Sequence, residues 1–231
     1  MTECQKLPLL ETFYEIRVCE NPTCGLRYPL VEGHPFGTRC PVCLGGTRLA
    51  AMKALPAERM THVKELAVFS ENAPARIRLH AVLDNIRSAW NVGAMFRTAD
   101  GLGVEKLYLC GITPTPENAA VQKTALGAEQ TVAWEYARDA VKLAERLKAE
   151  GCALWGLEQD ARALRLEKTN RIAEKQSREQ QVALVVGNEV TGVDPALLDL
   201  CEQIFYIPMR GQKRSLNVEV AFAIAAWALN G

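Results

Sequence analysis

Hydrophobic and polar positions follow two patterns along the chain from Arg76 to its end. Short apolar runs rich in Val, Leu and Ile predict strands, which span residues 77–83, 106–110, 131–136, 152–157, 182–186 and 203–207. Longer segments with apolar residues on one face predict helices, which span residues 92–102, 137–150, 195–200 and 218–229. Alternating strands and helices predict an α/β fold with a mainly parallel sheet covered on both faces.

Two of these segments carry more information than the rest. Residues 182–186 form a continuous apolar run, as expected of a central parallel strand that is buried on both sides. Residues 218–229 are apolar nearly all round, so this helix is either deeply buried or packed against another subunit. We expect a homodimer that uses part of it.

The N-terminal part has a different character. Residues 1–50 combine short strand-like runs with many turn residues, and we expect a small zinc-ribbon-like module there. Residues 51–75 read as a linker helix, with Pro56 suited to its first turn and an end before Pro74. Residues 76–231 form the third predicted part, the α/β domain.

Two close pairs of cysteines lie in the N-terminal module. The pairs have the spacings C-x4-C and C-x2-C and are separated by residues 25–39, a pattern that predicts a structural Cys4 zinc site on Cys19, Cys24, Cys40 and Cys43. Disulfides and free thiols are the alternatives, and disulfides are disfavoured in a chain without an export signal. The other four cysteines read as core residues (Cys110, Cys152, Cys201) or as a free thiol (Cys4).

Composition excludes some classes of protein and leaves others open. No apolar run reaches the ~18–20 residues of a membrane span, and the N-terminus has no apolar signal core, so we expect a cytoplasmic protein. The formal net charge is +0, so any affinity for phosphate must come from local clusters. The candidates are Arg210, Lys213 and Arg214, with Arg87 and Arg97, although each alone is equally well explained as a solvated surface residue.

Three polar segments interrupt the apolar pattern of the α/β domain. They read Asn91-Val-Gly-Ala-Met-Phe-Arg97-Thr-Ala, Val185-Val-Gly-Asn-Glu189-Val-Thr-Gly and Ile207-Pro-Met-Arg-Gly-Gln-Lys-Arg-Ser215-Leu-Asn217-Val. Singly, each has a purely structural explanation, because Asn and Ser are common helix caps and Gly187 suits a tight turn. Core packing does not require such loops, so three of them in one domain predict a single site assembled from distant parts of the chain. The usual glycine-rich nucleotide loops are absent.

Taken together, the three segments resemble the motifs of the SpoU (TrmH-type) branch of the SPOUT RNA methyltransferases. They occur in the family's order with compatible spacing, and Lys123-Thr-Ala-Leu-Gly-Ala resembles the family's segment between the first two motifs. The resemblance covers about Arg76 to Gly231. It implies a C-terminal deep trefoil knot, a homodimer, and transfer of a methyl group from S-adenosylmethionine to a ribose 2′-OH in tRNA or rRNA.

The resemblance also implies roles for individual residues. Backbone groups of Gly187, Ile207 and Leu216 hold the cofactor. The catalytic set is Arg97, Asn91, Glu189, Ser215 and Asn217. Arg97 is the residue nearest the hydroxyl, and because a guanidinium holds its proton strongly, we expect it to stabilise the developing alkoxide and grip the adjacent phosphate.

Other functions stay open at this stage. The chain could be a non-catalytic RNA-binding or assembly factor that has kept the cofactor pocket, or a base methyltransferase like other SPOUT branches; the Ser-Leu-Asn motif favours ribose. The zinc module either contacts RNA or only supports folding or dimerisation. Its candidate RNA contacts are Arg17, Arg27, Arg39, Arg48, Tyr14, Tyr28 and Phe36.

Overall fold

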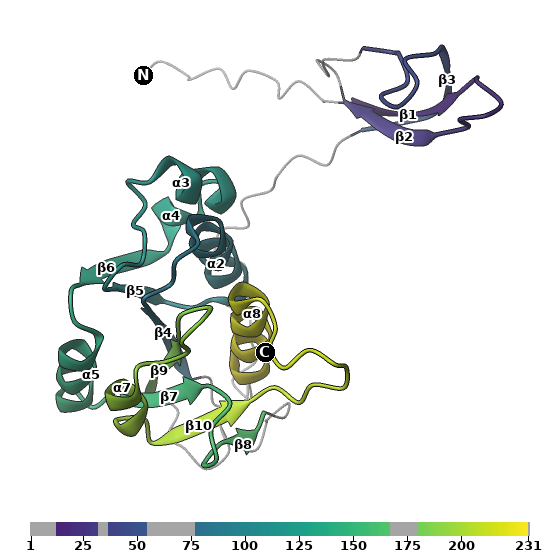
Figure 1. The fold of residues 1–231 in the computed structure, drawn as a ribbon. Helices are drawn as coiled ribbons and strands as arrows, with labels where there is room; N and C mark the ends of the chain where they lie inside the picture. The colour runs from purple at the N-terminus through teal and green to yellow at the C-terminus, as the bar shows by residue number, and fades with distance from the viewer. Residues whose placement is uncertain (1–12, 32–36, 55–76, 167–179, 231) are drawn as a thin grey trace, which may run out of the picture. The chain divides into compact units, whose positions relative to one another are not determined.

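A computed structural model describes residues 13–31, 37–54, 77–166 and 180–230 of the 231-residue chain (Figure 1). The chain divides into two compact units, Met1–Phe69 and Ser70–Gly231, and each is described by itself. Within the described ranges, no helix is both long and apolar enough to cross a membrane.

The N-terminal unit is built on a three-stranded antiparallel sheet. Strand β1 (Phe13–Cys19) lies in the middle, between β2 (Arg27–Val31) and β3 (Thr47–Ala54). The predicted module boundary at residue 50 therefore falls inside β3. Residues 51–54, predicted to begin a linker helix, pair with β1 instead, and the rest of that predicted helix lies outside the described residues.

The C-terminal unit contains one seven-stranded sheet in the order β6-β5-β4-β9-β7-β10-β8. Every pairing in it is parallel, which confirms the predicted fold class. The bounds are β4 Arg78–Asp84, β5 Lys106–Cys110, β6 Ala133–Ala137, β7 Ala153–Leu157, β8 Leu164–Arg165, β9 Gln181–Val186 and β10 Gln203–Tyr206. Residues 182–185 of β9 are fully buried at the centre of the sheet, as the continuous apolar run predicts.

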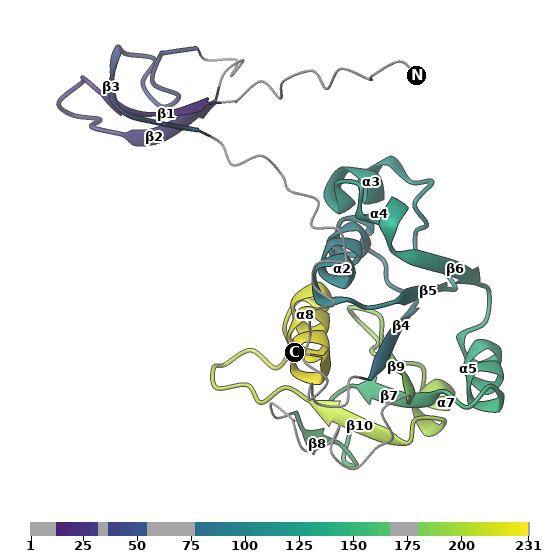
Figure 2. The same ribbon diagram turned by 180° about the vertical axis from the view of Figure 1, so that it is seen from behind.

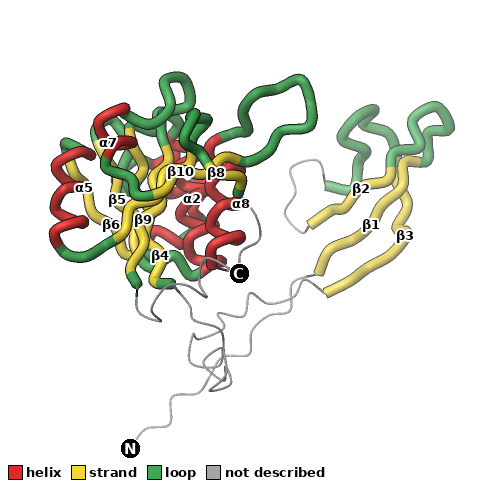
Figure 3. The backbone as a smooth tube through the Cα atoms, turned by 90° about the horizontal axis from the view of Figure 1, so that it is seen from below, coloured by secondary structure: helices red, strands yellow, loops and turns green. Residues whose placement is uncertain are grey.

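Helices cover both faces of this sheet, as Figures 2 and 3 show. One apolar cluster joins the sheet to α2 (Ala89–Leu102), α3 (Ala119–Ala125), α4 (Ala128–Thr131) and α8 (Val218–Asn230). A second cluster, on the opposite face, contains α5 (Ala140–Ala149) and α7 (Pro195–Asp199). The site described below lies at the edge of this three-layer sandwich where the strands end.

Capping residues explain where the helices differ from the prediction. Helix α5 begins at Ala140 and not at residue 137. The Asp139 carboxylate caps it by accepting hydrogen bonds from the backbone N–H groups of Val141 and Lys142. Helix α2 begins at Ala89, because Ser88 caps it in place of Asn91. Thr131, predicted to start a strand, ends α4 instead. Helices α3 and α4 and the two-residue strand β8 were not predicted, since segments this short leave little periodicity to detect.

Candidate functional site

Three loops meet where β4, β9 and β10 end, at the carboxyl edge of the parallel sheet. A cavity of about 440 Å³ opens at this edge, within the size range of small-molecule sites, and the segments that follow β7, β9 and β10 line it. Gly187, Ile207 and Leu216, the three residues predicted to hold the cofactor, all line this cavity. Three members of the predicted catalytic set line it as well, namely Glu189, Ser215 and Asn217.

Gly187 is required by the tight fold of the loop that follows β9. A Cβ atom at this position would lie 2.2 Å from the backbone nitrogen of Val193, so no other residue fits without a shift of the backbone. The loop closes on itself through paired backbone hydrogen bonds of 3.0 and 2.9 Å between Asn188 and Gly192. The Asn188 amide then donates to the carbonyl of Asn85 at 2.7 Å, which fastens the loop to the end of β4.

Glu189 joins this loop to the start of α2. Its carboxylate accepts hydrogen bonds from the backbone N–H groups of Arg87 (2.9 Å) and Ser88 (3.1 Å) and from the side-chain amide of Asn91 (3.1 Å). Partial burial would raise the pKa of Glu189, but these hydrogen bonds outweigh it and hold the pKa below its usual value. Glu189 is therefore a charged anchor at a helix N-terminus.

Asn217 brings in the third loop. Its amide donates to the side-chain oxygen of Asn91 at 3.1 Å, while its own oxygen accepts from the backbone N–H of Glu219 at 2.8 Å and caps α8. Because Ser88 caps α2, the Asn91 side chain is free to bridge Glu189 and Asn217. These three predicted site residues thus form one chain of hydrogen bonds that links all three motifs.

The opposite wall of the cavity comes from a loop that was not predicted to take part in the site. Glu158 follows β7 and accepts a hydrogen bond from the backbone N–H of Val193 at 3.0 Å. Gln159 donates to the carbonyl of Arg214 at 3.2 Å, which ties this wall to the third motif. The only available signal was their position directly after an apolar strand, where α/β sheets place ligand-binding residues.

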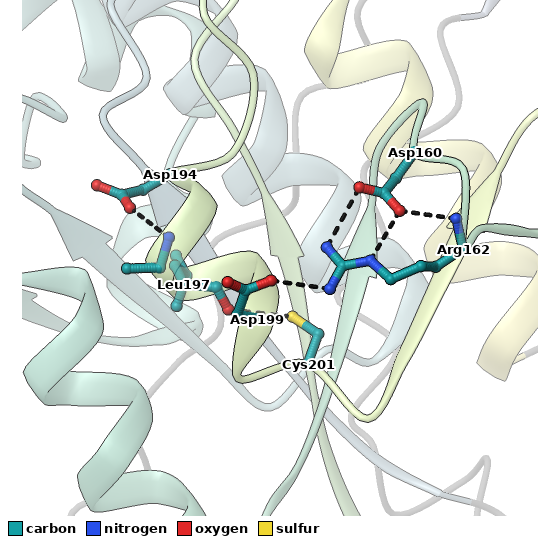
Figure 4. Close-up of polar contacts among 7 residues, drawn as sticks. Asp160, Arg162, Asp194, Leu197, Asp199 and Cys201 are labelled. Atoms are coloured by element: carbon teal, nitrogen blue, oxygen red, sulfur yellow. Dashed lines mark hydrogen bonds and ion pairs between the residues drawn. The ribbon is translucent and has the colours of Figure 1, made fainter.

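Charged residues link the loop that follows β7 to helix α7, as Figure 4 shows. Arg162 pairs with Asp160 at 2.9 Å and with Asp199, at the end of α7, at 2.8 Å. Asp194 caps the same helix by accepting the N–H of Ala196 at 2.8 Å. Arg162 therefore links the loop that follows β7 to the end of helix α7.

Arg97 does not line the cofactor-sized cavity. Its exposed side chain borders a neighbouring hollow of about 490 Å³, together with Lys123 and Glu219. Among the described residues, it makes no hydrogen bond or ion pair with the 187–189 or 207–217 loops. An indirect link exists, because the Thr98 hydroxyl donates to the Glu219 carboxylate at 2.9 Å and the backbone of Glu219 is held by Asn217.

The four cysteines of the N-terminal unit converge as the spacing predicts. Their sulfur atoms all lie within 4.8 Å of one another, with Cys19–Cys43 at 3.4 Å and Cys24–Cys40 at 3.7 Å. Tetrahedral zinc with Zn–S bonds of ~2.3 Å requires sulfurs ~3.8 Å apart, so the thiols fit a Cys4 site. No disulfide joins them.

Two similar backbone turns aim these thiols. The N–H of Cys19 donates to the carbonyl of Leu26 at 2.8 Å, and the N–H of Cys40 donates to that of Gly45 at 2.9 Å. The residue after the second cysteine of each pair is left-handed, with φ of 57° at Gly25 and 59° at Leu44. The two turns therefore share this hydrogen bond and this left-handed residue despite their different lengths.

Parallel strands that end in three interlinked polar loops over a cavity define an α/β ligand-binding domain of the type that the motifs predict. Comparison with family models identifies which one. Residues 78–227 match the model described as the SpoU rRNA Methylase family. The chain belongs to this family, and the resemblance seen in the motifs is confirmed.

Named relatives in the same family share about a third of the matched residues. The chain is 34% identical to the 23S rRNA (guanosine(2553)-2'-O)-methyltransferase RlmP of Bacillus subtilis, over 70% of this chain and 61% of that protein. It is 31% identical to the 23S rRNA (guanosine-2'-O-)-methyltransferase RlmB of Bordetella pertussis, over 63% of this chain and 56% of that protein. The chain thus spans less than two thirds of these relatives' lengths.

Solved structures agree on the fold. The TrmH/SpoU tRNA modifying enzyme of A. aeolicus matches with a TM-score of 0.57 at 25% identity, over 68% of this chain and 76% of that one. The AdoMet-bound rRNA methyltransferase of Sinorhizobium meliloti matches with a TM-score of 0.60 at 24% identity, over 68% and 57%. The trefoil knot implied by the resemblance stays a prediction.

Proposed function

We propose that this protein transfers a methyl group from S-adenosylmethionine to a ribose 2′-OH in RNA, with ribosomal RNA as the first substrate to test. The observation that supports this most directly is the hydrogen-bond chain Glu189–Asn91–Asn217, which unites the three family motifs beside a cofactor-sized cavity. The names of the relatives quoted above favour rRNA over tRNA. We place the protein in the cytoplasm, where such a substrate is found.

The cofactor fits the chemistry of the cavity wall. Gly187, Ile207 and Leu216 would hold it through backbone groups, and the absence of a side chain at Gly187 lets the loop close tightly, which sets the position of these groups. When bound, S-adenosylmethionine supplies a methyl group on a positively charged sulfur, which is already a good electrophile. The remaining task of the protein is to align the ribose oxygen and ease the loss of its proton.

Arg97 is the proposed catalytic cation. A ribose hydroxyl is a poor nucleophile, and a guanidinium beside it would stabilise the negative charge that develops as the oxygen attacks. Because Arg97 borders the hollow next to the cavity, the target ribose would lie between this hollow and the cofactor in the cavity. The hydroxyl proton would leave through the neighbouring phosphate or water. Ser215, exposed at the rim of the cavity, would help to position the phosphate.

A homodimer is the proposed assembly. Val220, Ile224 and Trp227 lie at i, i+4 and i+7 on α8 and are 40%, 38% and 47% exposed, which gives a helix with an apolar outer stripe. Sedimentation of the full chain should show a dimer. The variant Ile224→Glu should sediment as a monomer, whereas Ile112→Glu, at an exposed position after β5, should leave the dimer intact; a monomeric wild type would overturn this proposal.

We propose that the four cysteines bind a structural zinc ion.

We also propose that the three-stranded sheet of the N-terminal unit contacts RNA. Arg17 is removed from the candidate RNA contacts, because its guanidinium bonds to Glu15 and Thr47 and its side chain is only 12% exposed. Arg27 and Arg48 are both exposed and lie directly opposite Val18 on its two sides, so their side chains project from one face of the sheet. Charge reversal at both should weaken RNA binding and leave cofactor affinity unchanged; equal RNA affinity would argue for a purely structural module.

One assay tests the central proposal. The protein is incubated with radiolabelled cofactor and with total rRNA or total tRNA, and the product is mapped by alkaline hydrolysis. A 2′-O-methyl group blocks cleavage of the neighbouring phosphodiester, so the methylated position reads out directly. Label found in a base would favour base methylation instead. RNA binding without any incorporated label would favour a non-catalytic RNA-binding factor.

A further inference from the structure

An exposed tryptophan stands at the beginning of α2, directly before Asn91. Trp90 is 54% exposed, although aromatic side chains of this size are usually buried. Ala94 and Arg97 follow it four and seven residues later in α2, so the three side chains share one face of the helix. Trp90 and the proposed catalytic cation therefore lie ~10 Å apart along the axis of the same helix.

A lysine from another helix completes this surface. The Lys123 ammonium of α3 lies 5.4 Å from the centroid of the Trp90 ring, in cation–π geometry. Lys123 and Arg97 also line the same hollow, whose single acidic lining residue is Glu219. That carboxylate already accepts the Thr98 hydroxyl. Lys123 thus connects the two features, because it lies over the Trp90 ring and also lines the hollow with Arg97.

The two helices that carry these groups are held firmly together. A Cβ atom at Gly93 of α2 would lie 2.0 Å from the Thr124 hydroxyl oxygen and 2.3 Å from the carbonyl oxygen of Val121 in α3. Only glycine allows this close approach, so the spacing of the two helix backbones that carry Trp90 and Lys123 is set by their packing. The backbone positions are therefore in place before any ligand binds, which lowers the entropic cost of binding one.

We infer that Trp90 and Lys123 form a platform for an unpaired nucleotide that flanks the methylated one. Its base would stack on the indole, as bases do on aromatic side chains in single-strand binding, and its phosphate would be neutralised by Lys123. Since Asn91 is the next residue and Arg97 lies on the same helix face, this nucleotide would hold the target ribose at the catalytic loops. The inference rests on the proposed function and adds that the substrate is locally single-stranded.

The test compares variants of the full chain in binding a short single-stranded oligoribonucleotide and its duplex. Trp90→Ala should weaken binding of the single strand about 5- to 150-fold, the range expected for one lost stacking contact. Trp90→Phe should restore most of the affinity, because phenylalanine still offers a ring. Lys123→Gln should flatten the dependence of log affinity on log salt by about 0.7, whereas Lys142→Gln, an exposed lysine on α5, should leave it unchanged.

Kinetics and sedimentation separate this inference from its alternatives. With rRNA as substrate, Trp90→Ala should raise the KM for RNA more than it lowers kcat, with unchanged cofactor affinity. Unaltered KM and oligonucleotide affinity would overturn the platform while leaving the methyltransferase proposal standing. Dissociation of a wild-type dimer by Trp90→Ala would overturn it too, because the indole would then belong to a subunit interface. If the wild-type protein binds RNA through Trp90 but transfers no methyl group, the proposed function is wrong and the platform stands.

Discussion

Asn217 donates a hydrogen bond to the side-chain oxygen of Asn91 at 3.1 Å, across a sequence separation of 126 residues. The bond joins the cap of α8 to the first turn of α2, next to Glu189. We expect Asn91→Ala and Asn217→Ala each to slow methyl transfer, and the double variant to be less impaired than the sum of the two. A double-mutant cycle on kcat/KM should give a coupling of about 0.5–1.5 kcal/mol; additive losses would show that the bond does not contribute.

Arg97→Ala should abolish detectable methyl transfer and leave cofactor affinity within a few-fold of wild type. The reason is positional, because Arg97 borders the hollow beside the cofactor-sized cavity and not the cavity itself. Arg97→Lys keeps the charge but loses the planar donors, so we expect only partial activity. Calorimetric titration of the cofactor and single-turnover transfer to rRNA measure the two effects separately. Near-wild-type turnover in Arg97→Ala would remove this residue from the mechanism.

Substitutions of two glycines should give opposite results. Gly187→Ala would place a Cβ atom 2.2 Å from the Val193 nitrogen, so we expect cofactor binding to be lost and the melting temperature to fall. Gly211→Ala in the third motif meets no atom within 4 Å and serves as the matched control, with cofactor affinity close to wild type. Titration calorimetry and thermal melts of both variants check this. Full affinity in Gly187→Ala would mean that the loop rearranges at no cost.

The depressed pKa of Glu189 predicts a pH dependence of stability. A carboxyl group whose pKa is lower in the folded than in the unfolded state stabilises the fold above its unfolded value of about 4.3 and loses that contribution as pH falls through the folded value. Wild type should therefore exceed Glu189→Gln in urea resistance at neutral pH, and the difference should shrink below about pH 4. A difference that is constant from neutral to acidic pH would contradict the anchoring role of the carboxylate.

Leu44 offers a test of the zinc module. Its φ of 59° is left-handed, a conformation that costs a non-glycine residue about 1–2 kcal/mol, and its side chain is 57% exposed and buries little surface. Leu44→Gly should tighten zinc binding, whereas Gly25→Ala, at the matching position of the other turn, should weaken it. Competition with a chromophoric chelator measures both.

In wild type, chelation should melt residues 13–54 and leave cofactor binding intact; a loss of cofactor binding would contradict independent folding of the two units.

The sheet could be predicted in some detail because its central strands are buried on both faces. The run at 182–186 is apolar throughout, and the structure places it at the centre of the sheet as β9. Element ends were less predictable, since they depend on single capping side chains such as Ser88 and Asp139. The short helices α3 and α4 left almost no periodic signal, yet α3 carries Lys123.

The site was predictable only through its motifs. Residue types alone allowed Asn91 and Asn217 to be ordinary helix caps, and Asn217 does cap α8. That they also bond to one another, and that Arg162 pairs with Asp199 of α7, depends on the order of strands in space, which periodicity does not contain. Family resemblance supplied the roles of the residues in the three motifs, and the structure added Glu158 and Gln159 to the site.

Strand β9 lies between β4 and β7, although the ribosome makes both neighbours first. Until residues 181–186 emerge, two apolar strands have no partner on their inner edges, and such edges invite pairing with other chains. The strand that completes the middle of the sheet also leads directly into Gly187, and α8 follows last of all. The central sheet therefore cannot be completed before β9 is made, and nascent chains should need protection by chaperones during this interval.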